Sequence, residues 1–236
     1  PVLLAGLLGC APNINVPQPS SGSASFYQYV SLGDGYAAGY MDNALYRGGQ
    51  QNSYAVFLSQ QFRLAGGGAF VQPLLPESSG DIGIGTPIVS GGNNSRYVMR
   101  KQPDCTGQMS LEPVVLAEVG DTAALSNRVT GKFNDLSVAL GRSYHLTDNK
   151  LAQTLNIPNF NPYFARYATN PNVSPLDMAE AMEPTFYTLW AGMGDYLLYA
   201  AKGGRIKEKA NLGGFELTLT DIYKLSDPTD VEKKKK

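Results

Sequence analysis

The sequence contains few of the residues that form the disulfide bonds of small secreted proteins or bind metal ions. Its 236 residues include two cysteines and one histidine. Two cysteines are too few for a disulfide framework. His145 alone cannot form a multi-histidine zinc site. We therefore expect a protein that uses no metal and no other cofactor.

An excess of one charge and a long apolar run are also lacking. Nineteen Lys and Arg residues balance twenty Asp and Glu residues, so no global field recruits nucleic acid. The basic cluster at residues 233–236 is interpreted as a solvated tail. The apolar stretch at residues 1–9 is too short to cross a membrane as a helix.

Glycine and proline, by contrast, are abundant, with 26 and 15 residues. This content is typical of a chain with long ordered connections rather than a helical bundle. With 43% hydrophobic residues, the length suits one sizeable core. We expect a single domain over residues 26–236.

The N-terminus carries a motif that resembles a bacterial lipobox, Leu7-Leu8-Gly9-Cys10. We expect residues 1–25 to hold part of a lipoprotein signal peptide and a flexible polar tether. Lipid on Cys10 would anchor the protein in the cell envelope, and Ala11 after it favours the outer membrane of a Gram-negative bacterium. The alternative is a buried apolar N-terminus with an incidental cysteine. Cys105 is expected to be a buried, inert thiol.

The first half of the domain begins with a strand and a helix. Residues 27–32 alternate bulky side chains and meet Gly33, which predicts a strand and a tight turn. Asn52 or Ser53 caps a helix that a glycine triplet ends at residues 66–68. Its expected apolar face carries Tyr54, Phe57, Leu58 and Phe62. Residues 69–132 read as a loop-rich insertion with a strand at 96–100.

Regular structure returns near the C-terminus. Ser174, Pro175 and Asp177 predict a capped helix that runs to Glu183. Residues 185–191 form an apolar run typical of a strand buried on both faces of a parallel sheet. A glycine turn at 192–195 and a helix at 196–201 follow. This alternation indicates an α/β fold with a doubly wound sheet.

Several blocks give the chain a family resemblance. Gly33-Asp34-Gly35 resembles the Gly-Asp-Ser block of SGNH/GDSL-type hydrolases. Residues 49–54, 161–166 and 185–190 are further matches, similar to envelope lipoproteins of this family in Bacteroidetes-like bacteria. The resemblance implies a flavodoxin-like three-layer α/β/α sandwich, here C-terminally truncated. It also implies an esterase or acylhydrolase that binds acyl-ester or acetylated-carbohydrate ligands.

The catalytic groups that the resemblance implies are altered. Gly35 stands at the position of the serine nucleophile. Residues 134–141 correspond to the family's second block, and Ser137 stands there at the oxyanion position expected to hold glycine. Residues 192–195 correspond to the third block, and Gly194 stands there at the oxyanion position expected to hold asparagine. Asp34 and Asp195 remain. No Asp-x-x-His segment follows the third block. A hydroxyl nucleophile needs a base and a preorganised oxyanion site, so we expect catalysis to be impaired or lost.

Other candidate residues have structural interpretations. His145 is expected to be a surface or hydrogen-bonded structural histidine. Asp34 and Asp195 resemble a paired-carboxylate site, but each is expected to accept backbone N–H bonds within its own glycine turn. Aromatic side chains beside these turns are candidates to line a cleft: Tyr36, Tyr40, Tyr196 and Tyr199. The alternative is core or interface packing, which is expected for half or more of the aromatic side chains.

Three functional hypotheses remain open from the sequence. The chain is an esterase-like envelope lipoprotein with impaired catalysis and a retained ligand cleft. Alternatively, it is a non-catalytic binding or structural lipoprotein of the envelope. In the third hypothesis it is an altered fragment of an active ester hydrolase whose Asp-x-x-His segment is missing.

Overall fold

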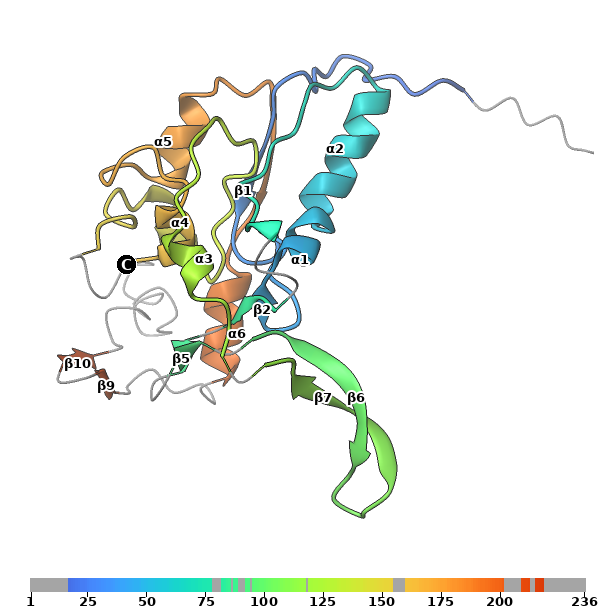
Figure 1. Cartoon of the computed structure of the whole chain (residues 1–236). Helices are drawn as coiled ribbons and strands as arrows, with labels where there is room; N and C mark the ends of the chain where they lie inside the picture. Colours follow the sequence, from blue (N-terminus) through green and yellow to red (C-terminus); the bar gives the residue numbers. More distant parts are fainter. Residues whose placement is uncertain are drawn as a thin grey trace, which may run out of the picture.

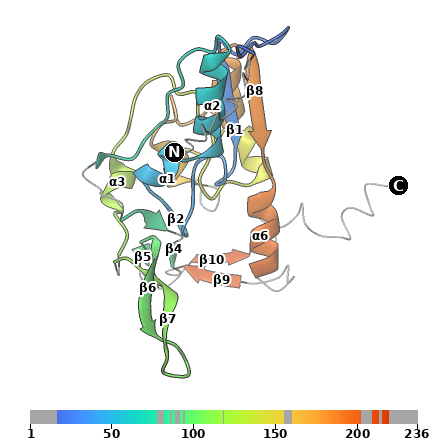
Figure 2. The same cartoon turned by 90° about the vertical axis from the view of Figure 1, so that its right-hand side faces the viewer.

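The computed structural model describes residues 17–77, 82–85, 87–88, 92–93, 95–117, 119–154, 160–201, 209–212 and 215–218. Within them the protein is a mixed α/β fold with small sheets of few strands (Figures 1 and 2). The elements in chain order are β1 (Tyr29–Gly33), β2 (Ala44–Leu45), α1 (Arg47–Gln51), α2 (Tyr54–Leu64), β3 (Ile84–Gly85), β4 (Pro87–Ile88), β5 (Gly92–Asn93), β6 (Tyr97–Pro103), β7 (Met109–Val115), α3 (Ala123–Ser126), the 3-10 turn η2 (Ser143–Thr147), α4 (Pro162–Ala165), α5 (Pro175–Glu180), β8 (Phe186–Trp190), α6 (Met193–Ala201), β9 (Lys209–Leu212) and β10 (Phe215–Thr218).

The centre of the fold is a set of three parallel segments. β1 pairs with β8 in parallel, with Tyr29 opposite Phe186 and Gly33 opposite Trp190. On its other side, β1 lies beside residues 134–138. The N–H of Ser31 donates to the carbonyl of Asn134 at 2.8 Å, and two further N–H groups of that segment donate back to β1. All three segments therefore end at the same edge.

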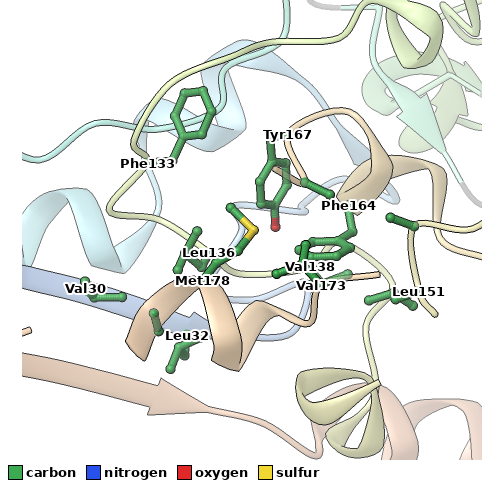
Figure 3. Close-up of a cluster of buried hydrophobic side chains, with 13 residues drawn as sticks. Val30, Leu32, Phe133, Leu136, Val138, Leu151, Phe164, Tyr167, Val173 and Met178 are labelled. Atoms are coloured by element: carbon green, nitrogen blue, oxygen red, sulfur yellow. The ribbon is translucent and has the colours of Figure 1, made fainter. Parts of the chain in front are cut away.

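Helices cover both faces of these segments. Val30 and Leu32 of β1 point to one face, where they pack with Leu136 and with Met178 of α5 (Figure 3). On the opposite face Phe62 of α2 makes edge contacts with Tyr29 and Phe186, at ring distances of 4.9 and 5.2 Å. Alternate side chains of a strand face opposite sides, so β1 needs cover on both.

The region predicted as an insertion contains a long antiparallel hairpin, β6 and β7, which projects away from the rest of the fold (Figure 1). β6 includes most of the strand expected at residues 96–100. Cys105 lies in the turn of this hairpin and is exposed. The expectation of a buried thiol is wrong, because a hairpin that leaves the body of the protein offers no core in which to bury it.

Three further expectations are corrected by the structure. α2 buries Ala55 and Ser59, whereas Phe57 of the expected apolar face is 52% exposed. α5 has the expected Ser174–Asp177 capping box but ends at Glu180, three residues early. β8 is not buried on both faces: in the described part of the chain it pairs only with β1, and Tyr187 and Leu189 are exposed.

Two remaining expectations concern the ends of the chain. Cys10 and the lipobox lie outside the described residues, as does the tetralysine tail. Among the residues that are described, no helix combines the length and apolar character needed to cross a membrane. The domain limits expected from the sequence stay a prediction.

Candidate functional site

The turns that follow the three parallel segments meet around one open cavity. The cavity has a volume of about 420 Å³ and lies where open α/β sheets place their binding sites. We call it the strand-end cavity. Its lining residues are Asp34, Gly35, Tyr36, Tyr40, Met41, Asp42, Asn43, Leu140, Gly141, Met193, Gly194 and Leu197.

Asp34 and Asp195 join these turns to one another. Asp34 is 2% exposed, and its two carboxylate oxygens accept the N–H groups of Tyr36 at 3.1 Å and Gly194 at 3.2 Å. A carboxylate oxygen of Asp195 accepts the N–H of Ser143 at 2.9 Å. The expectation that each aspartate accepts N–H bonds within its own glycine turn is therefore confirmed for Asp34, which also accepts a bond from Gly194. It is wrong for Asp195, which accepts a bond from a different segment.

Gly35 and Gly194 differ in the space around them. A Cβ at Gly35 would lie 3.3 Å from Cβ of Tyr40, so a small side chain fits with a slight adjustment. A Cβ at Gly194 would lie 2.3 Å from the carbonyl oxygen of Gly141, which is backbone and cannot move aside easily. The cavity could therefore take a serine at 35 but not an asparagine at 194 without rebuilding the adjacent loop.

Ser137 does not reach the strand-end cavity. It is 4% exposed, and its hydroxyl lies 3.4 Å from that of Ser31 beneath the turn. The loop residues that do line the cavity are Leu140 and Gly141. Leu140 has a φ of 55°, in the left-handed region that favours glycine. The second block therefore presents its later residues, and not Ser137, to the cavity.

His145 is a buried structural residue, not a surface one. It is 7% exposed in η2, and its Nδ1 accepts the N–H of Arg142 at 3.1 Å. Burial, followed by the nearby Arg142 charge, lowers the pKa of His145 to about 4, so the ring is neutral near pH 7. His145 is not among the residues that line the cavity.

A second buried titratable group lies behind the cavity. Asp135 is 3% exposed, and its carboxylate accepts hydrogen bonds from the Gln72 side chain at 3.0 Å and from the N–H of Ser137 at 3.2 Å. Desolvation outweighs these bonds and raises the pKa of Asp135 to about 6. By accepting the N–H of Ser137, the buried Asp135 carboxylate thus stabilises the second block.

Residues 161–166, one of the blocks that carry the resemblance, fasten the loops around the cavity. The Asn161 side chain caps α4 through the N–H of Phe164 and donates to the carbonyl of Ala139 at 2.9 Å. The Tyr163 hydroxyl donates to the carbonyl of Gly85 at 3.0 Å. The fully buried Arg166 donates to the carbonyl of Leu74 at 3.0 Å. This block therefore has a structural role.

A second open hollow, which we call the α2 cavity, adjoins the first at the start of α2. Its volume is about 490 Å³, and it is lined by Tyr36, Tyr40, Met41, Asn52, Ser53, Tyr54 and Phe57. Three of these residues, Tyr36, Tyr40 and Met41, also line the strand-end cavity. The two hollows therefore share one wall.

The tyrosines expected to line the cleft divide into two groups. Tyr36 and Tyr40 line both hollows, whereas Tyr196 is 68% exposed on α6 and lines neither. The side chain of Tyr199 lies outside the described set. The sequence reasoning missed Met193 and Leu197. Their i, i+4 spacing at the start of α6 was a usable signal, because such residues share a helix face.

The chemistry available in the strand-end cavity is limited. Its described walls contain no serine, threonine, cysteine or histidine, and no lysine or arginine. Across the described ranges, no group of three or more His, Cys, Asp or Glu side chains could hold a metal ion. The walls supply apolar contact, two tyrosine hydroxyls, an amide and two carboxylates.

No family model, curated protein or solved structure matches the chain.

Proposed function

We propose that this protein binds a neutral ligand with an apolar chain in a cleft derived from an SGNH-type esterase site, without hydrolysing it. The observation that carries the proposal is the strand-end cavity, whose lining includes Gly35, the residue that stands at the serine position in the sequence resemblance. A glycine offers no nucleophile, and the histidine lies outside the cavity walls.

The walls favour an acyl or alkyl chain. Met41, Leu140, Met193 and Leu197 supply apolar and adaptable surface. Asp34 and Asp42 add negative charge, with no cation among the described lining residues. A free fatty-acid carboxylate would meet these charges at close range, so an uncharged ester or ether is the better ligand.

The same proposal includes the finer fold and the cellular location. Three parallel segments with α2 and α5 on opposite faces support a flavodoxin-like α/β/α sandwich. The Leu7–Cys10 motif supports a lipid anchor in the cell envelope. Metabolic labelling with palmitate tests the anchor, since label should enter the full chain and be lost in Cys10→Ala.

Binding can be followed through Trp190, the single tryptophan of the chain. Trp190 is 44% exposed, and its ring stacks on Tyr36 of the cavity wall at 5.7 Å. We expect tetraethylene glycol monooctyl ether, an uncharged octyl chain, to change its fluorescence saturably below the micelle concentration. Octanoate should bind more weakly at pH 7 than the ether.

Two variants on the same helix make the test specific. Met193→Asp places a charge in the cavity wall at the first turn of α6, where an acidic residue suits the helix. It should weaken ether binding at least 10-fold. Tyr196→Asp adds the same charge three residues on, outside both cavities, and should leave binding unchanged. Equal effects in the two variants would remove support for this site.

Turnover is tested separately with 4-nitrophenyl butyrate. We expect no protein-dependent hydrolysis above background. Hydrolysis that disappears in His145→Ala would overturn the non-catalytic proposal and show that the reactive site is elsewhere.

A further inference from the structure

The α2 cavity has a more aromatic wall than the strand-end cavity, because Tyr54 and Phe57 line it in addition to the shared Tyr36 and Tyr40. Tyr36 and Trp190 stack with their rings inclined by 21°, and they are 60% and 44% exposed. The rings of Tyr54 and Trp190 lie 6.1 Å apart, and Phe57, 52% exposed, is a further aromatic side chain of the cavity wall. We call the lining residues Tyr36, Tyr54 and Phe57, together with Trp190 that packs against the first two, the aromatic platform.

Uncharged polar groups with unused hydrogen-bonding capacity lie beside this platform. The Asn52 amide donates to the carbonyl of Gly48, which leaves its own oxygen without a donor in the described part of the chain. Ser53 is 2% exposed, and its hydroxyl has no hydrogen-bond partner among the described residues. A buried hydroxyl without a partner is unfavourable, because it has lost its bonds to water without gaining one in the protein.

Flat aromatic faces beside neutral donors and acceptors suit one class of ligand. The C–H groups on the face of a pyranose carry slight positive charge and pack on the negative face of an aromatic ring. Its hydroxyls need partners that both donate and accept, which serine and asparagine provide. A phosphate would need cations, and none lies among the described residues of this wall.

We propose that the α2 cavity is a saccharide subsite, so that the full cleft holds a neutral glycolipid-type ligand. This proposal rests on the proposed function above. The apolar chain occupies the strand-end cavity and the sugar ring lies on the aromatic platform. The shared wall of Tyr36, Tyr40 and Met41 marks the junction between the two parts.

The test compares two ligands that carry the same octyl chain. Octyl β-D-glucoside presents a pyranose with C–H groups on both faces, and tetraethylene glycol monooctyl ether presents no ring. Both are titrated against Trp190 fluorescence below their micelle concentrations. We expect the glucoside to bind at least fivefold more tightly than the ether.

Variants on α2 test whether the preference for the glucoside arises in the α2 cavity. Phe57→Ala removes a platform side chain that lines only the α2 cavity, and it should lower glucoside affinity about 3- to 10-fold with little change for the ether. Leu64→Ala is the matched control, because Leu64 is 63% exposed at the far end of the same helix. It should change neither affinity. Circular dichroism melting confirms that each variant is folded.

Each outcome decides between the two proposals. Equal affinities for the two ligands, with the ether still sensitive to Met193→Asp, would overturn the saccharide subsite and leave the chain-binding cavity intact. A glucoside preference that survives both Phe57→Ala and Tyr36→Ala would place the sugar elsewhere and overturn the assignment. Absence of binding by both ligands would overturn the proposed function itself.

Discussion

A carboxylate oxygen of Asp34 accepts the N–H of Gly194 at 3.2 Å, which links the turn after β1 to the first turn of α6. The other oxygen accepts the N–H of Tyr36, two residues along the chain. These turns are 160 residues apart in sequence. One side chain therefore holds together two of the three turns that build the strand-end cavity.

The first prediction concerns this link. Asp34→Asn leaves one oxygen for two N–H groups and should lower the free energy of unfolding by about 1–3 kcal/mol. Asp195→Asn is the comparison, because Asp195 uses one carboxylate oxygen for the N–H of Ser143, and an amide oxygen can replace it. It should cost less than Asp34→Asn. Urea denaturation measures both, and an equal or larger loss for Asp195→Asn would contradict the role given to Asp34.

The second prediction separates Gly35 and Gly194, the glycines at positions where the resemblance expects serine and asparagine. Gly35→Ser should fold with a stability close to the starting protein, because its Cβ meets Tyr40 at 3.3 Å. It should remain inactive on 4-nitrophenyl butyrate, since His145 lies outside the cavity walls and is bonded to Arg142. Hydrolysis by Gly35→Ser would show that a base does reach the cavity.

Gly194→Asn should behave differently from Gly35→Ser. Its Cβ would lie 2.3 Å from the Gly141 carbonyl oxygen. The clash must move the loop, and overpacking of this kind costs roughly 1–3 kcal/mol. Thermal melting of the two variants side by side checks this, and a Gly194→Asn protein as stable as Gly35→Ser would contradict the observed loop position.

The third prediction is a pH dependence in which two buried groups oppose each other. The folded-state pKa of His145 is lowered from 6.5 to about 4, so its contribution to stability is present above pH 6.5 and is lost as pH falls. The folded-state pKa of Asp135 is raised from 3.8 to about 6, so its contribution is present below pH 3.8 and is lost as pH rises. Between pH 4 and pH 6 the contributions of His145 and Asp135 to the free energy of unfolding change in opposite directions and nearly cancel.

Substitution of either residue should reveal the pH dependence of stability that the other one contributes. Relative to the starting protein, the free energy of unfolding of His145→Asn should rise by on the order of 2 kcal/mol as pH falls from 6 to 4, because only the contribution of Asp135 remains. Asn also supplies an oxygen for the Arg142 N–H that His145 Nδ1 accepts. Asp135→Asn should lose a similar amount over the same range. Urea denaturation at the two pH values measures both, and parallel pH profiles for all three proteins would contradict the opposing terms.

The fourth prediction tests the block at residues 161–166. Asn161→Ala removes the α4 cap and the bond to the Ala139 carbonyl, and should cost about 1–3 kcal/mol. Asn172→Ala, which removes an exposed amide bonded to Gln153, should cost less than about 0.5 kcal/mol. Similar losses of unfolding free energy in the two variants would contradict the structural role given to the buried Asn161 amide.

The sequence by itself determined the local elements, because turn chemistry and capping act over a few residues. The strand ending at Gly33, the helix ended by the 66–68 glycines and the Ser174–Asp177 capping box each follow from short-range geometry. The sequence also shows that residue 35 is a glycine, and no fold can give it a side-chain hydroxyl. The cofactor and lipid-anchor expectations stay predictions.

Tertiary structure alone decided which residues meet. Ser137 matched the oxyanion block by sequence but is buried behind the turn, whereas Leu140 and Gly141 reach the cavity. The local sequence did not predict that Cys105 and β8 are exposed, because burial depends on which other segments of the chain pack against them. Trp190 stacks on Tyr36 because β8 pairs with β1 in parallel, which places two distant strand ends side by side. Long-range pairing is a property of the whole chain, so the sequence anticipated the cleft and two of its tyrosines, Tyr36 and Tyr40, but not how the remaining walls assemble.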